Sequence, residues 1–211
     1  DFRVQDLDLG GNGAPLVPIG DRLLFSEYDY CLNLGGFANV SFEEKIEQQK
    51  SKRVAYDVCP VNIVLNYLAE QKGYSFDESG NLARGGKLSE ELFQQLNDLS
   101  FYKMIPPKSL GLEWVKKELF PLLSSSTISI EDKLHTITEH FAFQLSSTFK
   151  KDSTILVTGG GAYNSYLLER INNYKKINLI IPPAELIEFK EALIFALLGI
   201  LKLRNENNCL K

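Results

Sequence analysis

Three short strand-like segments lie close together between residues 30 and 57, and this grouping limits the folds open to the chain. They are YCLNLG at 30–35, FANVSFE at 37–43 and RVAYD at 53–57. Each is rich in β-branched or aromatic residues, and the breaks are a Gly35-Gly36 turn and the polar stretch at 44–52. Strands joined by connections this short pair antiparallel, so the pattern predicts a three-stranded meander.

The rest of the chain alternates helices with further strands. A helix is expected at 60–73, with Pro60 at its start and Gly73 at its end. Residues 74–129 carry many turn signals around two short helical stretches, at 89–98 and 111–120, and are expected to form a loop-rich helical insertion. The expected elements that follow are a helix at 130–151, a strand, glycine turn and helix at 153–171, a strand at 177–183 and a helix at 185–204.

Without the insertion, the order is strand, strand, strand, helix, strand, helix, strand, helix. This order favours a ribonuclease-H-like lobe, a mixed sheet with helices on both faces, over a doubly wound dinucleotide fold with its regular alternation. Such lobes are the repeating halves of the actin-like ATPases, in which two lobes close on ATP. The predicted fold class is α/β, with residues 1–211 forming a C-terminal lobe. Because the chain starts at Asp1 in motif-like sequence, we expect it to lack an N-terminal lobe.

Composition and charge exclude several classes of partner. Of the 211 residues 44% are hydrophobic, and the net charge of -4 comes without a basic stripe, so nucleic acid is not an expected partner. The longest apolar run, at 192–201, is about half the length that spans a bilayer, and it predicts a buried helix rather than a membrane segment. Cys31, Cys59 and Cys209 are an odd number without CxxC spacing, which argues against a disulfide framework or zinc site and favours the cytoplasm.

The stretch DLDLGGNGAPLVP at 6–18 crowds two carboxylates, three glycines and two prolines into thirteen residues. The glycines let the backbone approach a bulky ligand, and Pro15 and Pro18 stiffen the exit. The same composition is also typical of an ordinary surface turn.

Two further glycine stretches can receive a ligand. The Gly35-Gly36 turn in NLGGFANVS can lay backbone N–H groups against phosphate oxygens, although a plain hairpin is the commoner use of this dipeptide. In ILVTGGGAYN, at 155–164, a hydrophobic strand runs into three glycines and then a helix. A flat ring or a phosphate can approach such a backbone, and a tight strand-to-helix turn is the alternative.

Five polar positions complete the residues considered. Asp57 is expected to end the third strand, where a carboxylate can hold a substrate hydroxyl or a metal-bound water, or can cap the next helix. Lys108 and Ser109, in PPKSLGLEW, can grip an acidic sugar or a phosphate, or form a solvated loop. His135 and His140 are five residues apart on one helix and point about 140° from each other, so we interpret them as ordinary helix residues.

Together these stretches resemble the anhydro-N-acetylmuramic acid kinase family. The motifs that carry the resemblance occur in the family's order and approximate spacing nearly from end to end of the chain; they are DFRVQDLDLGGNGAPLVP, NLGGFANV, YDVCPVN, FDESGNLARGG, PPKSLGLEW, VTGGGAYN and EALIFALLG. The resemblance implies an enzyme that uses ATP, Mg²⁺ and water to open the 1,6-anhydro ring of anhydro-N-acetylmuramic acid, giving N-acetylmuramic acid 6-phosphate in cell-wall recycling. It also suggests a homodimer.

The resemblance also assigns residues to roles. Asp6 takes the position of the catalytic base, whereas Asp8 stands where the family usually has alanine. Sugar contacts are expected from Arg3, Gly10, Gly11, Asp57, Lys108 and Ser109. Nucleotide contacts are expected from Asn33, Gly35, Gly36, Gly159, Gly160, Gly161 and Asn164.

One stretch departs from the family pattern. Where the family usually has Asp-Thr-Gly-Pro-Gly-Asn, residues 57–62 are Asp-Val-Cys-Pro-Val-Asn, with the loss of a hydroxyl and two glycines. This change leaves open a binding module that has lost turnover, and a related acid-sugar or acetate kinase is a third reading. The retained Asp6 and the intact GGNGAPLVP and PPKSLG strings favour the anhydro-sugar kinase.

Overall fold

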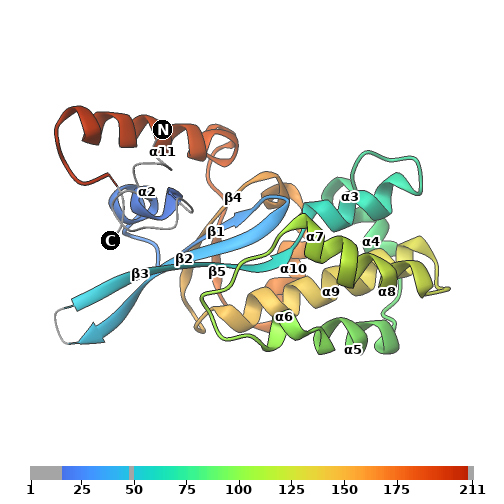
Figure 1. The fold of residues 1–211 in the computed structure, drawn as a ribbon. Helices are drawn as coiled ribbons and strands as arrows, with labels where there is room; N and C mark the ends of the chain where they lie inside the picture. The colour runs from blue at the N-terminus through green and yellow to red at the C-terminus, as the bar shows by residue number, and fades with distance from the viewer. Residues whose placement is uncertain (1–15, 48–49, 209–211) are drawn as a thin grey trace.

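The computed structural model describes residues 16–47 and 50–208, and its centre is one five-stranded sheet (Figure 1). The strands are β1 (Tyr30–Leu34), β2 (Phe37–Glu47), β3 (Lys50–Pro60), β4 (Thr154–Thr158) and β5 (Asn178–Ile180), in the order β3-β2-β1-β4-β5. β1, β2 and β3 form the antiparallel meander, and β4 pairs parallel with both β1 and β5. The predicted mixed sheet is therefore confirmed.

Helices cover both faces of this sheet (Figure 1). The helices α2 (Val17–Leu24) and α11 (Ala184–Leu203) form one layer, and α3 (Asn62–Glu70), α9 (Ile130–Thr148) and α10 (Ser165–Tyr174) lie in the other. The alternation of strand side chains produces the two layers. Leu32 and Val157 point into the large core under α9, whereas Cys31 and Leu156 pack with Phe25 on the opposite face.

The segment between α3 and α9 is helical, as expected, and is divided into more pieces. They are η1 (Glu78–Gly80), α4 (Asn81–Gly85), α5 (Glu90–Asp98), α6 (Ser100–Lys103), α7 (Leu112–Trp114), the π-helical η2 (Val115–Leu119) and α8 (Phe120–Ser125). Leu92, Leu96, Leu119 and Leu123 are buried in the same core as Phe141 of α9. The insertion therefore shares the core of the sheet.

Several boundaries differ from the sequence expectation. β2 and β3 continue through most of the polar stretch at 44–52, which we expected to be a connection. Cross-strand pairing places Glu43 opposite Arg53 and Glu44 opposite Lys52, and such opposite charges stabilise the hairpin. β3 also runs to Pro60, so Asp57 does not end the strand and the next helix starts at Asn62.

The helix α2 is not predicted by the residue pattern, because Pro18 and Gly20 are turn-forming residues. Pro18 stands in the first turn, where its missing N–H breaks no helical hydrogen bond. Gly20 lies against α11, and a Cβ there would be 2.5 Å from the Ile194 side chain. Both residues are therefore compatible with a helix packed closely on another helix.

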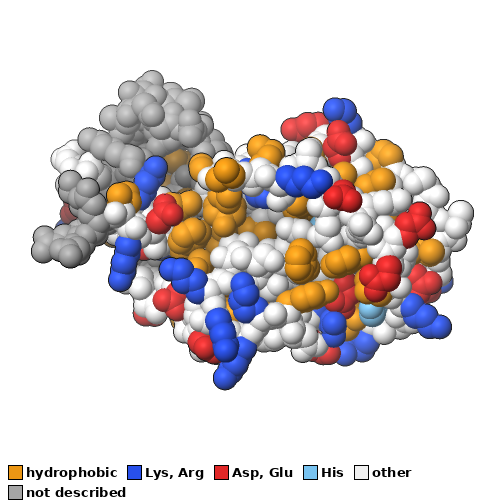
Figure 2. Space-filling model, turned by 90° about the horizontal axis from the view of Figure 1, so that it is seen from below, with side chains coloured by type: hydrophobic (Ala, Val, Ile, Leu, Met, Phe, Trp, Pro, Cys, Tyr) orange, Lys and Arg blue, Asp and Glu red, His pale blue; other side chains and the backbone are white. Residues whose placement is uncertain are grey.

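The apolar run at 192–201 lies within α11 and is buried on one side only, which corrects the expectation of a buried helix. Ile194 and Leu198 are buried, whereas Leu193 and Ile200 are 47% and 54% exposed. Among the described residues, no helix is long and apolar enough to cross a bilayer. Charged side chains of both signs are interspersed over the face shown in Figure 2. Cys31 and Cys59 are free and buried, and Cys209 lies outside the described residues.

His140 of α9 is fully buried against α5, where its Nδ1 lies 3.2 Å from Asn97 Oδ1. Burial lowers the pKa of His140 from 6.5 to about 3. The unfolded chain therefore binds a proton below pH 6.5 that the folded chain does not bind until about pH 3. His140 thus stabilises the fold least at acidic pH.

We expect the free energy of unfolding to fall by about 2 kcal/mol more between pH 7.5 and pH 5 in the wild type than in His140→Gln, since only the wild type carries this linkage. Urea denaturation at the two pH values measures the difference. Identical pH dependence in the two proteins would show that His140 is protonated in the folded state.

Candidate functional site

The parallel pairing of β1 with β4 brings two glycine turns to one edge of the sheet. Asn33 pairs with Thr158, so both strands end at the same level. Gly35-Gly36 follows β1 directly, and Gly159 to Gly161 follow β4 and open the short helix η3 (Gly160–Tyr163). This edge, made by Gly35, Gly36 and Gly159 to Gly161, is called the glycine rim below.

The turn that follows β4 packs against the last residues of β1, Asn33 and Leu34, which lead directly into the other turn. Gly159 has φ 80°, and a Cβ on it would lie 2.7 Å from Asn33 Oδ1 and 2.9 Å from the Leu34 carbonyl. A Cβ on Gly161 would lie 2.7 Å from Leu34 Cβ. These two positions need glycine for packing, whereas Gly160 is exposed and its nearest contact would be Asn62 Nδ2 at 3.7 Å. The open position of the rim is therefore Gly160.

Most backbone N–H groups of the glycine rim make no hydrogen bond to another described residue. Among the described residues, no hydrogen bond uses the N–H of Gly35, Gly36, Gly160 or Gly161, and Gly159 alone donates, to Ile187 O at 3.2 Å. Successive amide donors on a turn form a concave site for an anion. These N–H groups of the rim are therefore candidate donors to phosphate oxygens.

The start of α3 fixes the β1–β2 turn in place. Val61 N–H donates to Gly36 O at 2.8 Å, and Asn62 N–H donates to Gly35 O at 3.3 Å. The Asn62 side chain donates from Nδ2 to Leu34 O at 3.1 Å, and a Cβ added at either Gly160 or Gly161 would lie within 4 Å of it. Sequence reasoning missed Asn62 as a site residue, although its retention in the otherwise altered 57–62 stretch was an available signal.

Asn164 has a capping role in the structure. Its Oδ1 accepts a hydrogen bond of 3.0 Å from Leu167 N–H at the start of α10, and its side chain packs against Gly80, which leaves it 7% exposed. A nucleotide contact from Asn164 remains a prediction.

Asp57, Lys108 and Ser109, three of the expected sugar contacts, lie next to one another in the structure. Asp57 N–H donates to Lys108 O at 2.9 Å, and the Asp57 carboxylate accepts hydrogen bonds from Leu110 N–H at 2.8 Å and Ser109 Oγ at 3.4 Å. The carboxylate therefore holds the 108–110 loop and does not cap α3, whose first residue has no side-chain cap. Burial raises the pKa of Asp57, and the two hydrogen bonds oppose this shift.

The Lys108 ammonium points toward Phe101 of α6. Nζ donates to Phe101 O at 3.0 Å and lies 4.3 Å from the centre of the Phe101 ring. Partial burial lowers the pKa of Lys108. A contact of this ammonium with a ligand remains a prediction and would require a change of rotamer.

The residues that replace the family's usual 58–61 pattern are buried. Val58, Cys59 and Val61 are at most 4% exposed and belong to the large core. Burial raises the pKa of the Cys59 thiol well above its usual value, so the thiol stays protonated. These substitutions fill the interior, while Asp57 and Asn62 on either side remain at the site.

The remaining candidates divide into two groups. His135 Nδ1 lies 3.0 Å from Ala83 O, and the part of the chain that the structure describes holds no group of three or more His, Cys, Asp or Glu side chains that could bind a metal. Asp6, Arg3, Gly10 and Gly11 lie outside the described residues. Their predicted roles are unchanged by the structure.

The family model and the curated relatives that match this chain carry the same name. The sequence model of the family described as "Anhydro-N-acetylmuramic acid kinase" matches residues 1–209. Proteins of that name from Aliivibrio fischeri and Sulfurovum sp. are 34% and 32% identical over 81% and 100% of this chain. The matches span 48% and 59% of those relatives, so the chain covers about half the length of the curated proteins it resembles.

A solved structure, an activator of the 2-hydroxyisocaproyl-CoA dehydratase from Clostridium difficile with bound ADPNP, is also similar. It matches 84% of this chain and 61% of its own, with 18% identity and a TM-score of 0.48. Similarity at this level carries no weight for function.

We expect Gly161→Ala to lower the free energy of unfolding by about 1–3 kcal/mol, because the new Cβ overlaps Leu34, whereas Gly160→Ala should change it by less than about 0.5 kcal/mol. Urea denaturation of both variants checks the contrast. Equal losses would mean that the two turns of the rim are not packed as described.

Proposed function

This chain belongs to the anhydro-N-acetylmuramic acid kinase family, and we propose that it is the C-terminal lobe of an enzyme that converts anhydro-N-acetylmuramic acid to N-acetylmuramic acid 6-phosphate with ATP and water. The single observation that carries the proposal is the glycine rim, whose free amide groups sit beside an exposed glycine in a chain of this family. The product would enter cell-wall recycling in the cytoplasm.

The glycine rim is the proposed nucleotide side of the site. Gly35 and Gly36 would face phosphates, and Gly159 to Gly161 would lie against the adenosine, with Asn33 between the two turns. Mg²⁺ usually binds through one or two carboxylates and the substrate phosphates, so we assign it to the phosphates and give it no ligand set in this chain. When bound, it would neutralise phosphate charge. A preceding lobe would complete the ATP site, and residues 1–211 alone would be inactive.

The Asp57 cluster is the proposed sugar side. Ser109 is exposed, and the Asp57 carboxylate keeps lone pairs beyond the two hydrogen bonds that it accepts, so a sugar hydroxyl can donate to it. Arg3, Gly10, Gly11 and Lys108 would add contacts by family resemblance.

Asp6 is the proposed general base. Its carboxylate would take a proton from a water molecule as the water oxygen attacks the anomeric carbon. The bond from that carbon to O6 breaks, and O6 takes the γ-phosphoryl group while ADP leaves. The protein would chiefly position these groups and stabilise their charge.

A binding module without turnover is the second candidate, and the altered 58–61 stretch is the observation that favours it. Because Val58, Cys59 and Val61 are core residues, we give this candidate less weight than the kinase. Measurement of phosphate transfer to the anhydro-sugar by the full-length protein separates the two.

We expect Gly160→Leu, in the full-length protein, to raise the Kd for ATP about tenfold or more and to leave the Kd for the anhydro-sugar unchanged, since the side chain would occupy the place of the nucleotide. Gly199→Leu is the matched control, because a Cβ there meets nothing within 4 Å. Calorimetric titration of each ligand decides the matter, and equal losses for both ligands would refute the assignment.

We expect Asp6→Asn to fold and bind both ligands while turnover falls by about 10²-fold or more, because the amide cannot accept the proton. Asp8→Asn is the control and should cost little, since the family has alanine there. Steady-state rates of both variants test this pair. The reverse pattern would mean that the motif is misaligned, and full activity in both would place the base elsewhere.

A further inference from the structure

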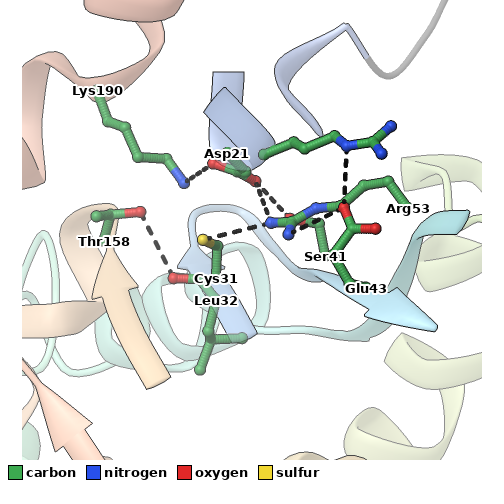
Figure 3. A network of polar contacts seen from close by, with 9 residues as sticks. Asp21, Cys31, Leu32, Ser41, Glu43, Arg53, Thr158 and Lys190 are labelled. Atoms are coloured by element: carbon green, nitrogen blue, oxygen red, sulfur yellow. Dashed lines mark hydrogen bonds and ion pairs between the residues drawn. The ribbon is translucent and has the colours of Figure 1, made fainter. Parts of the chain in front are cut away.

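A buried network of charged and polar side chains lies on the side of the sheet opposite the large core (Figure 3). Asp21 of α2 is at its centre. Its carboxylate accepts from Lys190 Nζ of α11 at 2.9 Å and from Ser41 Oγ of β2, and it lies 4.0 Å from Arg53 Nη2 of β3. Arg53 also donates to Ser41 Oγ at 2.9 Å and lies 3.8 Å from Glu43. Asp21, Arg53 and Lys190 are all at most 8% exposed.

Hydrophobic packing alone does not select one face of α11. Ile194 and Leu198 pack against Leu16 and Ile19, but apolar side chains also occupy the outer side, where Phe189 is 60% and Ile200 is 54% exposed. A helix that is apolar on several sides can bury nearly the same area after rotation, because the hydrophobic effect is non-directional. A buried charge does not allow such rotation, because Lys190 would lose its only anionic neighbour among the described residues.

The face that Lys190 selects also reaches the glycine rim. Ile187, three residues before Lys190 and therefore on the same side of the helix, accepts the hydrogen bond from Gly159 N–H. One residue further on, Glu188 Oε1 accepts a hydrogen bond of 3.1 Å from Tyr163 OH at the end of η3. Rotation or sliding of α11 would remove both partners from the turn that follows β4.

We propose that the Asp21–Lys190 pair positions α11 so that Ile187 holds the Gly159–Gly161 turn in its ligand-binding shape. Asp21 and Lys190 are positioning residues in this scheme, and neither touches the ligand. The link to ATP rests on the proposed function, whereas the link to Gly159 does not.

The test uses Lys190→Met, Asp21→Asn and the double variant in the full-length protein, at a temperature at which circular dichroism shows all of them folded. Met keeps the length and the apolar stem of Lys190. Lys190→Met is therefore expected to fold even if Asp21→Asn does not. Leu123→Ala, in the buried part of α8, is the control for a general loss of stability.

Two measurements are made on each variant. Amide hydrogen exchange at Gly159, followed by NMR, should become at least tenfold faster in each single variant. In the double variant it should be no faster than in the single variant with the faster exchange. It should be unchanged in Leu123→Ala. The Kd for ATP should rise about tenfold, with the Kd for the anhydro-sugar unchanged.

Unchanged exchange at Gly159 in both single variants would overturn the proposal, as would equal acceleration in Leu123→Ala. Accelerated exchange with equal losses of ATP and sugar affinity would overturn its link to the nucleotide side. Accelerated exchange in a protein whose wild type binds no ATP would support the positioning role and refute the proposed function.

Discussion

The parallel pairing of β1 with β4 is the interaction on which the candidate site depends. These strands are more than a hundred residues apart in the sequence, and their register, Asn33 to Thr158, decides that two glycine turns end at one level. A shift by one residue would turn every side chain of β4 to the other face and separate Gly161 from Leu34. The core beneath α9 prevents this shift, because Leu32, Ile155 and Val157 are all fully buried there.

Local signals in the sequence predicted most of the sheet and the glycine turns. The strand at 154–158 is rich in β-branched residues, the strand at 30–34 is mostly apolar, and glycines follow both directly. Such patterns depend on neighbouring residues alone. Helix α2 and the exposed side of α11 could not be predicted in this way, because α2 and α11 pack on each other although they are far apart in the sequence. The hydrogen-bond partner of Asp57 is also distant in the sequence, since Leu110 lies 53 residues away.

The sequence indicated which residues are candidates for the site more readily than which partners their side chains have. The family motifs assigned Asp57, Lys108 and Ser109 to one ligand, and in the structure Asp57 of β3 hydrogen-bonds the loop that carries the other two. Their contact with a sugar stays a prediction. Asn62 was overlooked because an asparagine near a helix start is usually a cap, whereas here its side chain bonds to the end of β1. Asn164 shows the opposite case, since a residue in a ligand-binding motif caps a helix.

The shared core of the insertion has a mechanical consequence. Leu92, Leu96, Leu119 and Leu123 are buried with Phe141, so the insertion cannot hinge away from α9 without exposing apolar surface. The 108–110 loop is held from both sides, by Asp57 of the sheet and by Phe101 of the insertion. Displacement of the 108–110 loop would therefore break hydrogen bonds both to β3 and to α6.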